Sequence, residues 1–473
     1  MNDSVSTKEA FESSLKYFSG DKLAASVFSG KYALPDGNGM LLESTPDQMH
    51  ARLAREFARV ESKYKNSMSE KEIYDLFSEW IIVPQGSPLS GVGNSLQVQS
   101  LSNCFVIAPP HDSYGGILHS DQEQVQIMKR RGGVGFDVSN IRPRGESTAN
   151  AARTTDGISI FMERFSNSCR EVAQGGRRGA LMITIDCRHP EIETFINIKR
   201  DRKKVTGANI SVRFNDEFMK AVQDDSEYTL RWPVNSSIEQ AKVVSVVKAR
   251  NVWEKFIDAT WECAEPGALF WDRIQEGPAD CYSSVGYETI STNPCAEIPL
   301  SSYDSCRLMV INLTKFVRKP YEKSSWFDYQ AFEETSQKAQ RLMDDLIDLE
   351  IEAVDKILEK KRCSYLLAPL GITGLGDTLA ALNMKYGSEK SIKITSDIYK
   401  RLAISAYTSS IMMASERGSF PVYDLTLEAN NSYLENIHNE LPEEINNLRL
   451  KHGRRNIALL TTAPVGSISC LTQ

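Results

Sequence analysis

The sequence predicts an α/β protein with a largely parallel sheet, preceded by a mainly helical region. Two patterns support this prediction. Over roughly the first hundred residues, apolar side chains recur at helical spacing. After that, short apolar runs alternate with longer amphipathic stretches, as in a sheet whose parallel strands are connected by helices. The 473 residues, 41% of them hydrophobic, are enough to bury the core of one large domain or two ordinary ones.

The helical region is predicted to span residues 1–95. Within it, residues 46–65 carry apolar side chains on one face of a helix. Ser69, with Glu72 three residues later, forms a capping-box pattern that predicts the start of a second helix. Residues 84–93 are rich in proline and glycine, so they predict a loop and a domain boundary.

The second region is predicted to span residues 96–473 and to alternate strands with helices. The predicted strands are 104–108, 135–138, 181–185, 209–214 and 457–461. The predicted helices are 120–131, 156–172, one beginning near 215, 329–361 and 388–417. Residues 465–473 look like a strand and loop in the middle of a domain, so we expect the chain to be part of a longer, split or separately encoded protein.

Charge and hydropathy argue against two classes of protein. The net charge of −7 leaves no broad basic field to attract phosphates, so we expect no coating of nucleic acid, although a few arginines suffice to bind a small nucleotide. The N-terminus has no apolar signal-peptide core, and no run approaches about 18 apolar residues. We therefore expect a cytoplasmic protein with no membrane span.

The nine cysteines and six histidines show no metal-binding spacing. There is no CxxC pair and no HxxxH pair, so we expect no metal site within the chain. In a reducing compartment most of these cysteines stay thiols, and any disulfide is expected to be catalytic or transient.

One segment, Ser291–Leu300, concentrates groups that can do chemistry. In an extended backbone, Asn293, Cys295 and Glu297 would project to the same side and place an amide, a thiol and a carboxylate at one site. The alternative reading is a buried structural cysteine beside two surface polar residues. A cysteine nucleophile usually needs a histidine base, and none lies near in sequence, so the group fits a radical thiol better than a hydrolase.

Several ordered blocks make the chain resemble the catalytic subunit of ribonucleotide reductases over nearly its whole length. The blocks are 102–105, 132–136, 141–145, 174–180, 293–297, 304–306 with 311–313, 371–377 and 463–469. The resemblance implies a ten-stranded α/β barrel with the radical cysteine on a loop inside it. Because the chain stops just after the last block, we expect the last strands of that barrel to be missing from it.

The resemblance also assigns roles to five residues. Cys295 would become the thiyl radical that abstracts the 3′-hydrogen of the substrate ribose. Glu297 would take the proton of the 3′-hydroxyl, and Asn293 would hydrogen-bond the substrate hydroxyls. Cys104 and Cys306 would lie across the ribose, supply two electrons as the 2′-hydroxyl leaves as water, and end as a disulfide. Their Cα atoms would then have to lie within about 7 Å of each other.

The substrate's phosphates are expected at the block that closes the chain, where glycine and serine offer backbone and hydroxyl donors. The expected substrate-binding residues are Ser102, Asn103, Pro464, Val465, Gly466, Ser467, Ile468 and Ser469. The glycine runs at 132–135 and 371–376 do not follow the dinucleotide-binding pattern. We expect close backbone approaches at these glycines instead.

An effector site for a deoxynucleoside triphosphate or ATP is also implied. Asp112 and Arg142 match effector-binding positions, and the loop 174–179 would relay the effector's identity to the substrate base. In that loop the expected residues are Gly175, Gly176, Arg177 and Arg178. Helices near 118–131 and 156–173 would form the face of a homodimer, with allosteric coupling between the two sites.

The radical source implied by the resemblance is adenosylcobalamin, because only ten residues separate Cys295 from Cys306. A radical supplied by a separate metal-carrying subunit is the alternative. Expected partners are a ribonucleoside di- or triphosphate, a thioredoxin- or glutaredoxin-type reductant, and a C-terminal counterpart polypeptide or splicing product that completes the barrel. The competing function is a non-catalytic deoxynucleotide-binding sensor or fragment.

Overall fold

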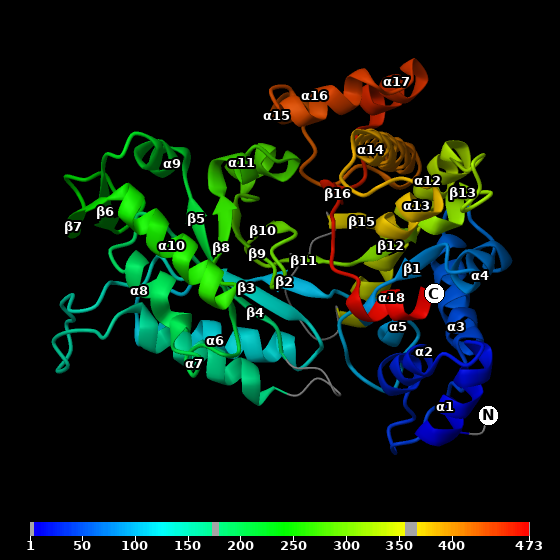
Figure 1. Cartoon of the computed structure of the whole chain (residues 1–473), viewed down its shortest axis with the longest axis horizontal. Helices are drawn as coiled ribbons and strands as arrows, with labels where there is room; N and C mark the ends of the chain where they lie inside the picture. Colours follow the sequence, from blue (N-terminus) through cyan, green and yellow to red (C-terminus); the bar gives the residue numbers. More distant parts are fainter. Residues whose placement is uncertain (1–3, 173–178, 355–366, 473) are drawn as a thin grey trace. The chain divides into compact units, whose positions relative to one another are not determined.

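The computed structural model describes residues 4–172, 179–354 and 367–472 (Figure 1). The chain forms two compact units, one made of residues 1–103 and 306–473 and the other of residues 104–305. The predicted α/β class with a helical N-terminal region is confirmed. Among the described residues, no helix is both long and apolar enough to cross a membrane.

The unit of residues 104–305 is built on a six-stranded sheet. From edge to edge the strands are β11 (Asp304–Cys306), β2 (Cys104–Val106), β3 (Gly133–Asp137), β4 (Leu181–Asp186), β5 (Asn209–Phe214) and β8 (Gly267–Phe270). Strands β2, β3, β4, β5 and β8 run parallel. The helices that connect successive parallel strands are α6 (Tyr114–Met128), α7 (Ile158–Glu171), α8 (Ile192–Asn197), and α9 (Asp216–Gln223) with α10 (Ala249–Cys263).

Burial explains why the central strands β3 and β4 contain few polar residues. Every residue of β3 and β4 is buried, as expected for parallel strands that are covered on both faces. Phe136 of β3 packs on Phe165 of α7, with ring centroids 4.8 Å apart. The polar side chains of Asp137 and Thr184 are buried in the same strands and are hydrogen-bonded to each other at 2.8 Å.

The other unit combines a four-stranded sheet with most of the helices. The sheet order is β1 (Ile82–Pro84), β12 (Met309–Asn312), β15 (Leu367–Thr373) and β16 (Ala458–Leu460). Strand β1 is antiparallel to β12, and β12, β15 and β16 are parallel. The helices are α1 (Thr7–Tyr17), α2 (Lys22–Val27), α3 (Pro46–Glu61), α4 (Glu70–Ser78), α5 (Gly86–Gly91), α12 (Tyr329–Val354), α13 (Leu375–Ala381), α14 (Glu389–Arg417), α15 (Leu425–Glu428), α16 (Ser432–Asn439), α17 (Glu443–His452) and α18 (Gly466–Thr472).

Three sequence predictions of local structure are wrong. The predicted loop at 84–93 contains α5, whose residues are all buried, so packing outweighs the turn preference of its glycines and proline. The helix expected from residue 120 begins at Tyr114, because the Ser113 side chain caps it. The strand and loop expected at 465–473 contains α18 instead. The expected end of the helix 329–361 lies outside the described residues.

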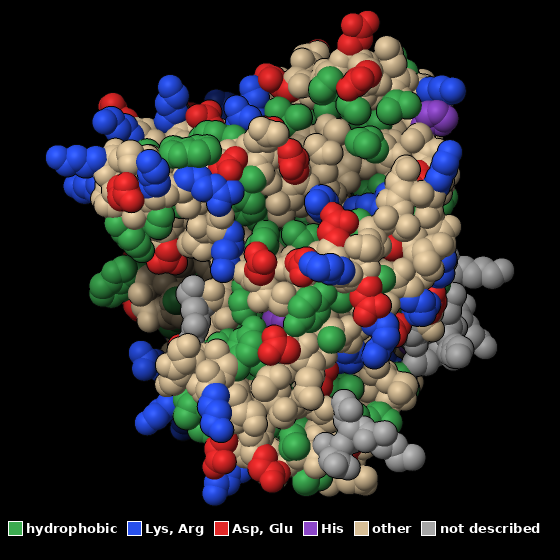
Figure 2. Space-filling view, turned by 90° about the vertical axis from the view of Figure 1, so that its right-hand side faces the viewer, with side chains coloured by type: hydrophobic (Ala, Val, Ile, Leu, Met, Phe, Trp, Pro, Cys, Tyr) green, Lys and Arg blue, Asp and Glu red, His purple; other side chains and the backbone are tan. Residues whose placement is uncertain are grey.

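Charges are mixed on the surface that can be seen from one side. On the face shown in Figure 2, acidic and basic side chains are interspersed with apolar ones. The net charge of −7 arises from 62 acidic and 55 basic residues. On this face the two signs are therefore spread among each other, as expected for a well-solvated protein surface.

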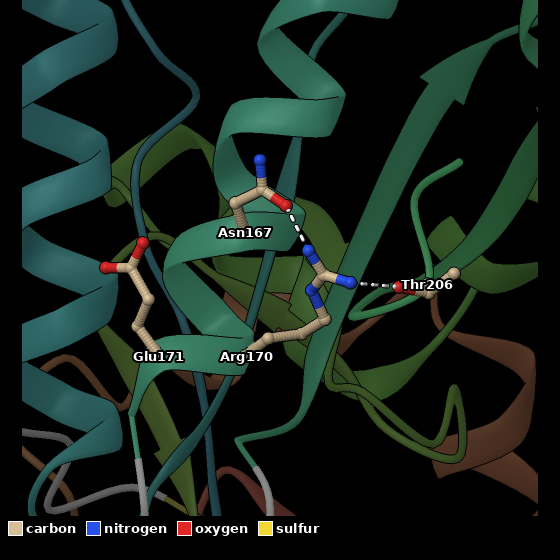
Figure 3. A pocket seen from close by; sticks show the side chains of 4 residues that line it. All are labelled: Asn167, Arg170, Glu171 and Thr206. Carbon is tan, nitrogen blue, oxygen red and sulfur yellow. Dashed lines mark hydrogen bonds between the residues drawn. The ribbon is translucent and has the colours of Figure 1, made fainter. Parts of the chain in front are cut away.

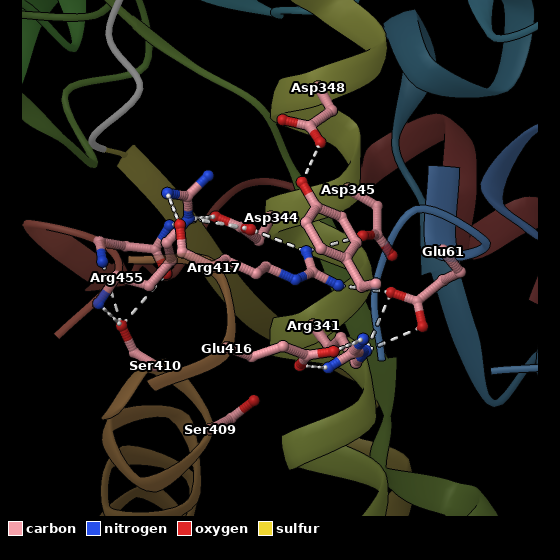
Figure 4. A network of polar contacts seen from close by, with 12 residues as sticks. Glu61, Arg341, Asp344, Asp345, Asp348, Ser409, Ser410, Glu416, Arg417 and Arg455 are labelled. Carbon is pink, nitrogen blue, oxygen red and sulfur yellow. Dashed lines mark hydrogen bonds and ion pairs between the residues drawn. The ribbon is translucent and has the colours of Figure 1, made fainter. Parts of the chain in front are cut away.

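A network of buried charges joins α3, α12 and α14 (Figure 4). The side chain of Arg417, at the end of α14, is buried and forms ion pairs with Glu61, Asp344 and Asp345 at 2.5, 2.8 and 2.8 Å. Its guanidinium lies 3.7 Å from the centre of the Tyr64 ring. Burial raises the pKa of Asp345 well above its usual range, although Arg417 opposes the rise. These carboxylates can stay in the interior because arginines pair with them: Arg417 pairs with all three, Arg341 also pairs with Glu61, and Arg455 also pairs with Asp344.

We predict that Arg417→Gln destabilises this unit strongly. Removal of the buried cation takes Arg417 away from Asp345, while Glu61 keeps its ion pair with Arg341 and Asp344 keeps its ion pair with Arg455. The loss of one partner from a buried ion pair costs about 3–5 kcal/mol. Thermal unfolding of the purified protein, followed by circular dichroism, measures the effect. Lys71→Gln is the matched control, since it removes a cation from the exposed Lys71–Asp75 pair on α4 and should leave the melting temperature unchanged. Equal melting temperatures for wild type and Arg417→Gln would contradict the prediction.

Candidate active site

A β-hairpin carries the three side chains that the sequence singles out. Its strands, β9 (Thr289–Thr292) and β10 (Pro299–Ser301), pair antiparallel. Cys295 lies in the connecting loop, and its side chain is exposed. The predicted extended backbone is wrong here, because residues 293–298 form a turn in which Ala296 has a φ of 63°.

Asn293 is the buried centre of this loop. Its Nδ2 donates to Glu297 Oε2 at 2.5 Å and to Cys104 Sγ at 3.3 Å. Its Oδ1 accepts the N–H of Ile298 at 3.2 Å. The structure therefore brings Asn293, Glu297 and Cys104 into one hydrogen-bonded cluster, with Cys295 on the same loop.

The carboxyl group of Glu297 is poorly solvated. Burial raises its pKa above the ordinary value for glutamate, while the hydrogen bond from Asn293 opposes the rise. A carboxylate with a raised pKa is a better proton acceptor near neutral pH. Glu297 can therefore exchange a proton with a ligand that binds beside this loop.

Strand β3 packs closely against the hairpin. A Cβ atom on Gly135 would lie 1.9 Å from the carbonyl oxygen of Thr292, and one on Gly133 would lie 2.8 Å from the side chain of Pro294. Side chains alternate between the two faces of a strand, and Phe136 accordingly packs on α7 instead. This glycine run is a close backbone approach, as its pattern predicts, and it lets β9 lie directly on β3.

Polar side chains of the sheet contact the hairpin as well. Ser291 Oγ lies 3.0 Å from Thr184 Oγ1, which donates to Asp137 Oδ2 at 2.8 Å. Arg213 forms an ion pair with Asp137 at 3.0 Å and donates from Nη1 to the carbonyl oxygen of Ile290 at 3.1 Å. Burial raises the pKa of Asp137, and the charge of Arg213 opposes the rise. A shift of the hairpin would leave these buried groups without their partners, which is costly.

Asn209 contacts the residue that precedes Cys295. Its Nδ2 donates to the carbonyl oxygen of Pro294 at 2.8 Å, so it holds the peptide that leads into Cys295. Sequence reasoning missed Asn209. Its only signal is a polar side chain at the first position of a predicted strand, which many strands share.

The other two predicted catalytic cysteines lie at strand ends. Cys104 is the first residue of β2, Cys306 is the last residue of β11, and both are buried. The N–H of Asn103 donates to the carbonyl oxygen of Cys306 at 2.9 Å, within one unit. Within the other unit, the N–H of Tyr303 donates to the carbonyl oxygen of Val106 at 2.7 Å. Segments that flank the two cysteines are thus joined by backbone hydrogen bonds.

The predicted phosphate segment, residues 464–469, leads into α18 and forms its first turn. The side chain of Ile468 is buried in the apolar core, so only its backbone can face a ligand. Ser467 Oγ lies 2.5 Å from the hydroxyl of Tyr32. Ser102, the predicted binding residue before Cys104, is fully buried.

Of the predicted effector residues, the structure describes Asp112 and Arg142, and it pairs them. Arg142 Nε donates to Asp112 Oδ2 at 2.8 Å, and the backbone N–H of Arg142 donates to Oδ1 at 3.0 Å. The other predicted effector residues lie outside the described residues: Gly175, Gly176, Arg177 and Arg178.

A polar pocket of about 590 Å³ lies at the C-terminal end of α7 (Figure 3). Arg170 donates to Asn167 Oδ1 at 2.5 Å and to Thr206 Oγ1 at 3.0 Å, and Glu171 points to the other side in this view. A second groove, of about 710 Å³, runs between α6 and α7, the helices that the sequence assigns to a dimer face. The homodimer stays a prediction.

Two family models match this chain. The model described as "Ribonucleotide reductase, barrel domain" matches residues 102–473. The model described as "Ribonucleotide reductase, all-alpha domain" matches residues 18–97. Together they span nearly all of the described residues.

Curated proteins with the same kind of name are similar to the chain. A vitamin B12-dependent ribonucleoside-diphosphate reductase from Mycobacterium tuberculosis is 28% identical over 95% of this chain and 60% of its own length. A protein of the same name from Thermoplasma acidophilum is 29% identical over 85% of this chain and 58% of its own length. A ribonucleoside-diphosphate reductase large chain from Neurospora crassa is 26% identical over 78% of this chain and 42% of its own length. The chain thus spans less than two thirds of the length of these relatives.

We predict that Gly135→Ala disturbs the packing of the hairpin against β3. The added Cβ meets the carbonyl oxygen of Thr292, a backbone atom that cannot turn aside, and overpacking of this kind costs about 1–3 kcal/mol. A lowered melting temperature and an altered rate of Cys295 alkylation by iodoacetamide are the expected results. Gly376→Ala is the matched control, because a Cβ there meets nothing within 4 Å. If both variants behaved like wild type, β3 would not constrain the hairpin.

Proposed function

Because this chain belongs to the ribonucleotide reductase family, we propose that it carries the active site for the reduction of ribonucleotides to 2′-deoxyribonucleotides. One observation supports this above all. Buried Asn293 donates hydrogen bonds to both Glu297 and Cys104, and exposed Cys295 lies on the same loop. An amide, a carboxylate and two thiols so arranged suit radical reduction of a sugar better than hydrolysis, which would need a base for the thiol.

In the proposed reaction each residue has one task. Cys295, as a thiyl radical, removes the 3′-hydrogen of the ribose, and Asn293 hydrogen-bonds the sugar hydroxyls. Glu297 accepts the proton of the 3′-hydroxyl. The 2′-hydroxyl takes a proton from one of the two thiols and leaves as water. The other proton and the two electrons of Cys104 and Cys306 pass to the sugar as the thiols become a disulfide, and Glu297 returns its proton to the 3′-oxygen. Cys295 finally recovers its hydrogen atom.

The substrate and effector assignments are proposals of the same kind. We propose that the backbone and hydroxyls of residues 464–469 bind the substrate's phosphates, with Ser102 and Asn103 beside the ribose. As substrate we propose a ribonucleoside diphosphate and not a triphosphate, since the names of the relatives specify the diphosphate. For the effector nucleotide we propose the region of Asp112 and Arg142.

Adenosylcobalamin is the cofactor that we propose, because the relatives from Mycobacterium tuberculosis and Thermoplasma acidophilum are named as vitamin B12-dependent. The exposure of Cys295 fits a radical source that reaches the thiol from outside the chain. When bound, the cofactor would supply the radical that takes the hydrogen atom from this thiol. The loop 293–298 would face it, and Asn293 and Asn209 would keep the loop in place.

Formation of deoxynucleotide tests the proposal. The chain is incubated with a ribonucleoside diphosphate, dithiothreitol, an effector triphosphate and adenosylcobalamin, alone and with a polypeptide that carries the portion of the relatives that it does not match. Cys263 is a partly exposed cysteine on α10 and serves as the control. Loss of deoxynucleotide formation in Cys295→Ala, together with wild-type formation in Cys263→Ala, would support the proposed function. If no product forms under these conditions or with a radical-generating metal subunit, while deoxynucleotide still binds, the sensor reading replaces it.

We predict that Glu297 sets the acidic limb of the pH profile. As a base it works in the ionised form, so the wild-type rate should rise as the pH rises through its pKa, which lies above the ordinary value of about 4.3. Glu297→Gln should lower turnover by about 100-fold or more and abolish this limb. Initial rates across the acidic to neutral range measure both effects. Glu276 is an exposed carboxylate that directly follows α11 (Trp271–Gln275), and the control variant Glu276→Gln should keep the wild-type pH profile. An unchanged pH profile in Glu297→Gln would refute the role of Glu297 as the base.

A further inference from the structure

Glu350, near the C-terminal end of α12, is a carboxylate buried in the interior. Its side chain is only 3% exposed. It accepts hydrogen bonds from Ser100 Oγ at 2.6 Å and from the N–H of Leu101 at 2.5 Å, and the N–H of Ser102 bonds it as well. Glu350 therefore holds the stretch of chain that ends one residue before Asn103 and two before Cys104.

Arg307 is the charged partner of Glu350. It directly follows Cys306 and is 1% exposed, which places it among the largest fully buried side chains. Burial raises the pKa of Glu350, and the positive charge of Arg307 opposes the rise. Two opposite charges in the interior depend on each other, because either one alone would be strongly destabilising.

The two segments held in this way are also bonded to each other. The N–H of Asn103 donates to the carbonyl oxygen of Cys306 at 2.9 Å. Glu350 bonds the segment on one side of this hydrogen bond, and its partner Arg307 belongs to the segment on the other side. Glu350 is thus hydrogen-bonded to the chain immediately before Cys104, and the positive charge that acts on it belongs to the residue immediately after Cys306.

We propose that Glu350 and Arg307 are positioning residues that set the reduction potential of the Cys104–Cys306 couple. This inference rests on the proposed function, in which these two thiols are the two-electron donor. Disulfide geometry is narrow, so the stability of the bond depends on how firmly the flanking backbone is held. Loss of the Glu350 charge removes a negative charge that acts on buried Arg307, loosens both segments and makes the disulfide easier to reduce.

Equilibration of the full chain with mixtures of reduced and oxidised dithiothreitol tests this inference. The two thiols and oxidised dithiothreitol are in equilibrium with the protein disulfide and reduced dithiothreitol, so electrons and protons balance. Alkylation of the remaining thiols and peptide mass spectrometry give the disulfide fraction for this pair alone. Glu350→Gln keeps the size of the side chain and removes its charge, and the equilibrium constant for disulfide formation should fall about tenfold, which corresponds to ~30 mV.

Arg417→Gln is the control, because it breaks buried ion pairs of the same unit whose partners are Glu61, Asp344 and Asp345 and not these segments. It should lower the melting temperature without changing the equilibrium constant. If Glu350→Gln does not fold, Arg307→Lys replaces it, since it keeps the charge but not the guanidinium fork, and a shift of the same sign, about threefold, is expected.

Three distinguishable results would contradict either the proposed function or the positioning role of Glu350. If the wild-type chain forms no Cys104–Cys306 disulfide at any ratio, the proposed function fails. If the disulfide forms with the same equilibrium constant in wild type and in Glu350→Gln, only the positioning role fails. If Arg417→Gln shifts the constant as much as Glu350→Gln does, the effect is one of general stability and the positioning role fails as well.

Discussion

The hairpin that bears Cys295 depends on a strand that has no side chains where the hairpin lies. The backbone of β9 approaches β3 so closely that even a methyl group on Gly135 would overlap the carbonyl oxygen of Thr292. A contact between two backbones has no rotamers and little room to adjust. The distance between the hairpin and the sheet is therefore set by the main chain. The surrounding side chains only have to orient Asn293 and Glu297, which lie on the same loop as Cys295.

Both units place charges inside and keep them there by pairing. Asp137 with Arg213 lies beneath the hairpin, and Arg417 with its carboxylates joins helices that are far apart in sequence. Buried ion pairs contribute little net stability compared with apolar packing, yet the loss of one partner is expensive. Such pairs therefore favour one arrangement of the connected segments over its near alternatives, which is what a site with narrow geometric demands needs.

Sequence patterns predict the parts of this structure that local chemistry decides. The apolar runs at 181–185 and 209–214 become β4 and β5, because such runs must be buried. The spacing of an extended strand predicts that Asn293 and Glu297 share a site, and they do meet, but across a turn. The roles of Asn209 and Glu350 could not be predicted, since each depends on a partner that is more than 80 and about 250 residues away. Only the folded chain brings such partners together.

The hydrogen bonds of Asn293 have a consequence for any hydroxyl-bearing ligand that enters the site. An amide nitrogen carries two hydrogens, and both are engaged, one by Glu297 and one by Cys104. An incoming hydroxyl that accepts from Asn293 must therefore replace one of these acceptors. If it replaces Glu297, the carboxylate loses one of the two hydrogen bonds that lower its pKa, and its affinity for a proton increases. Arrival of such a ligand would then itself increase the proton affinity of Glu297, which the hydrogen bond from Asn293 keeps lower in the empty site.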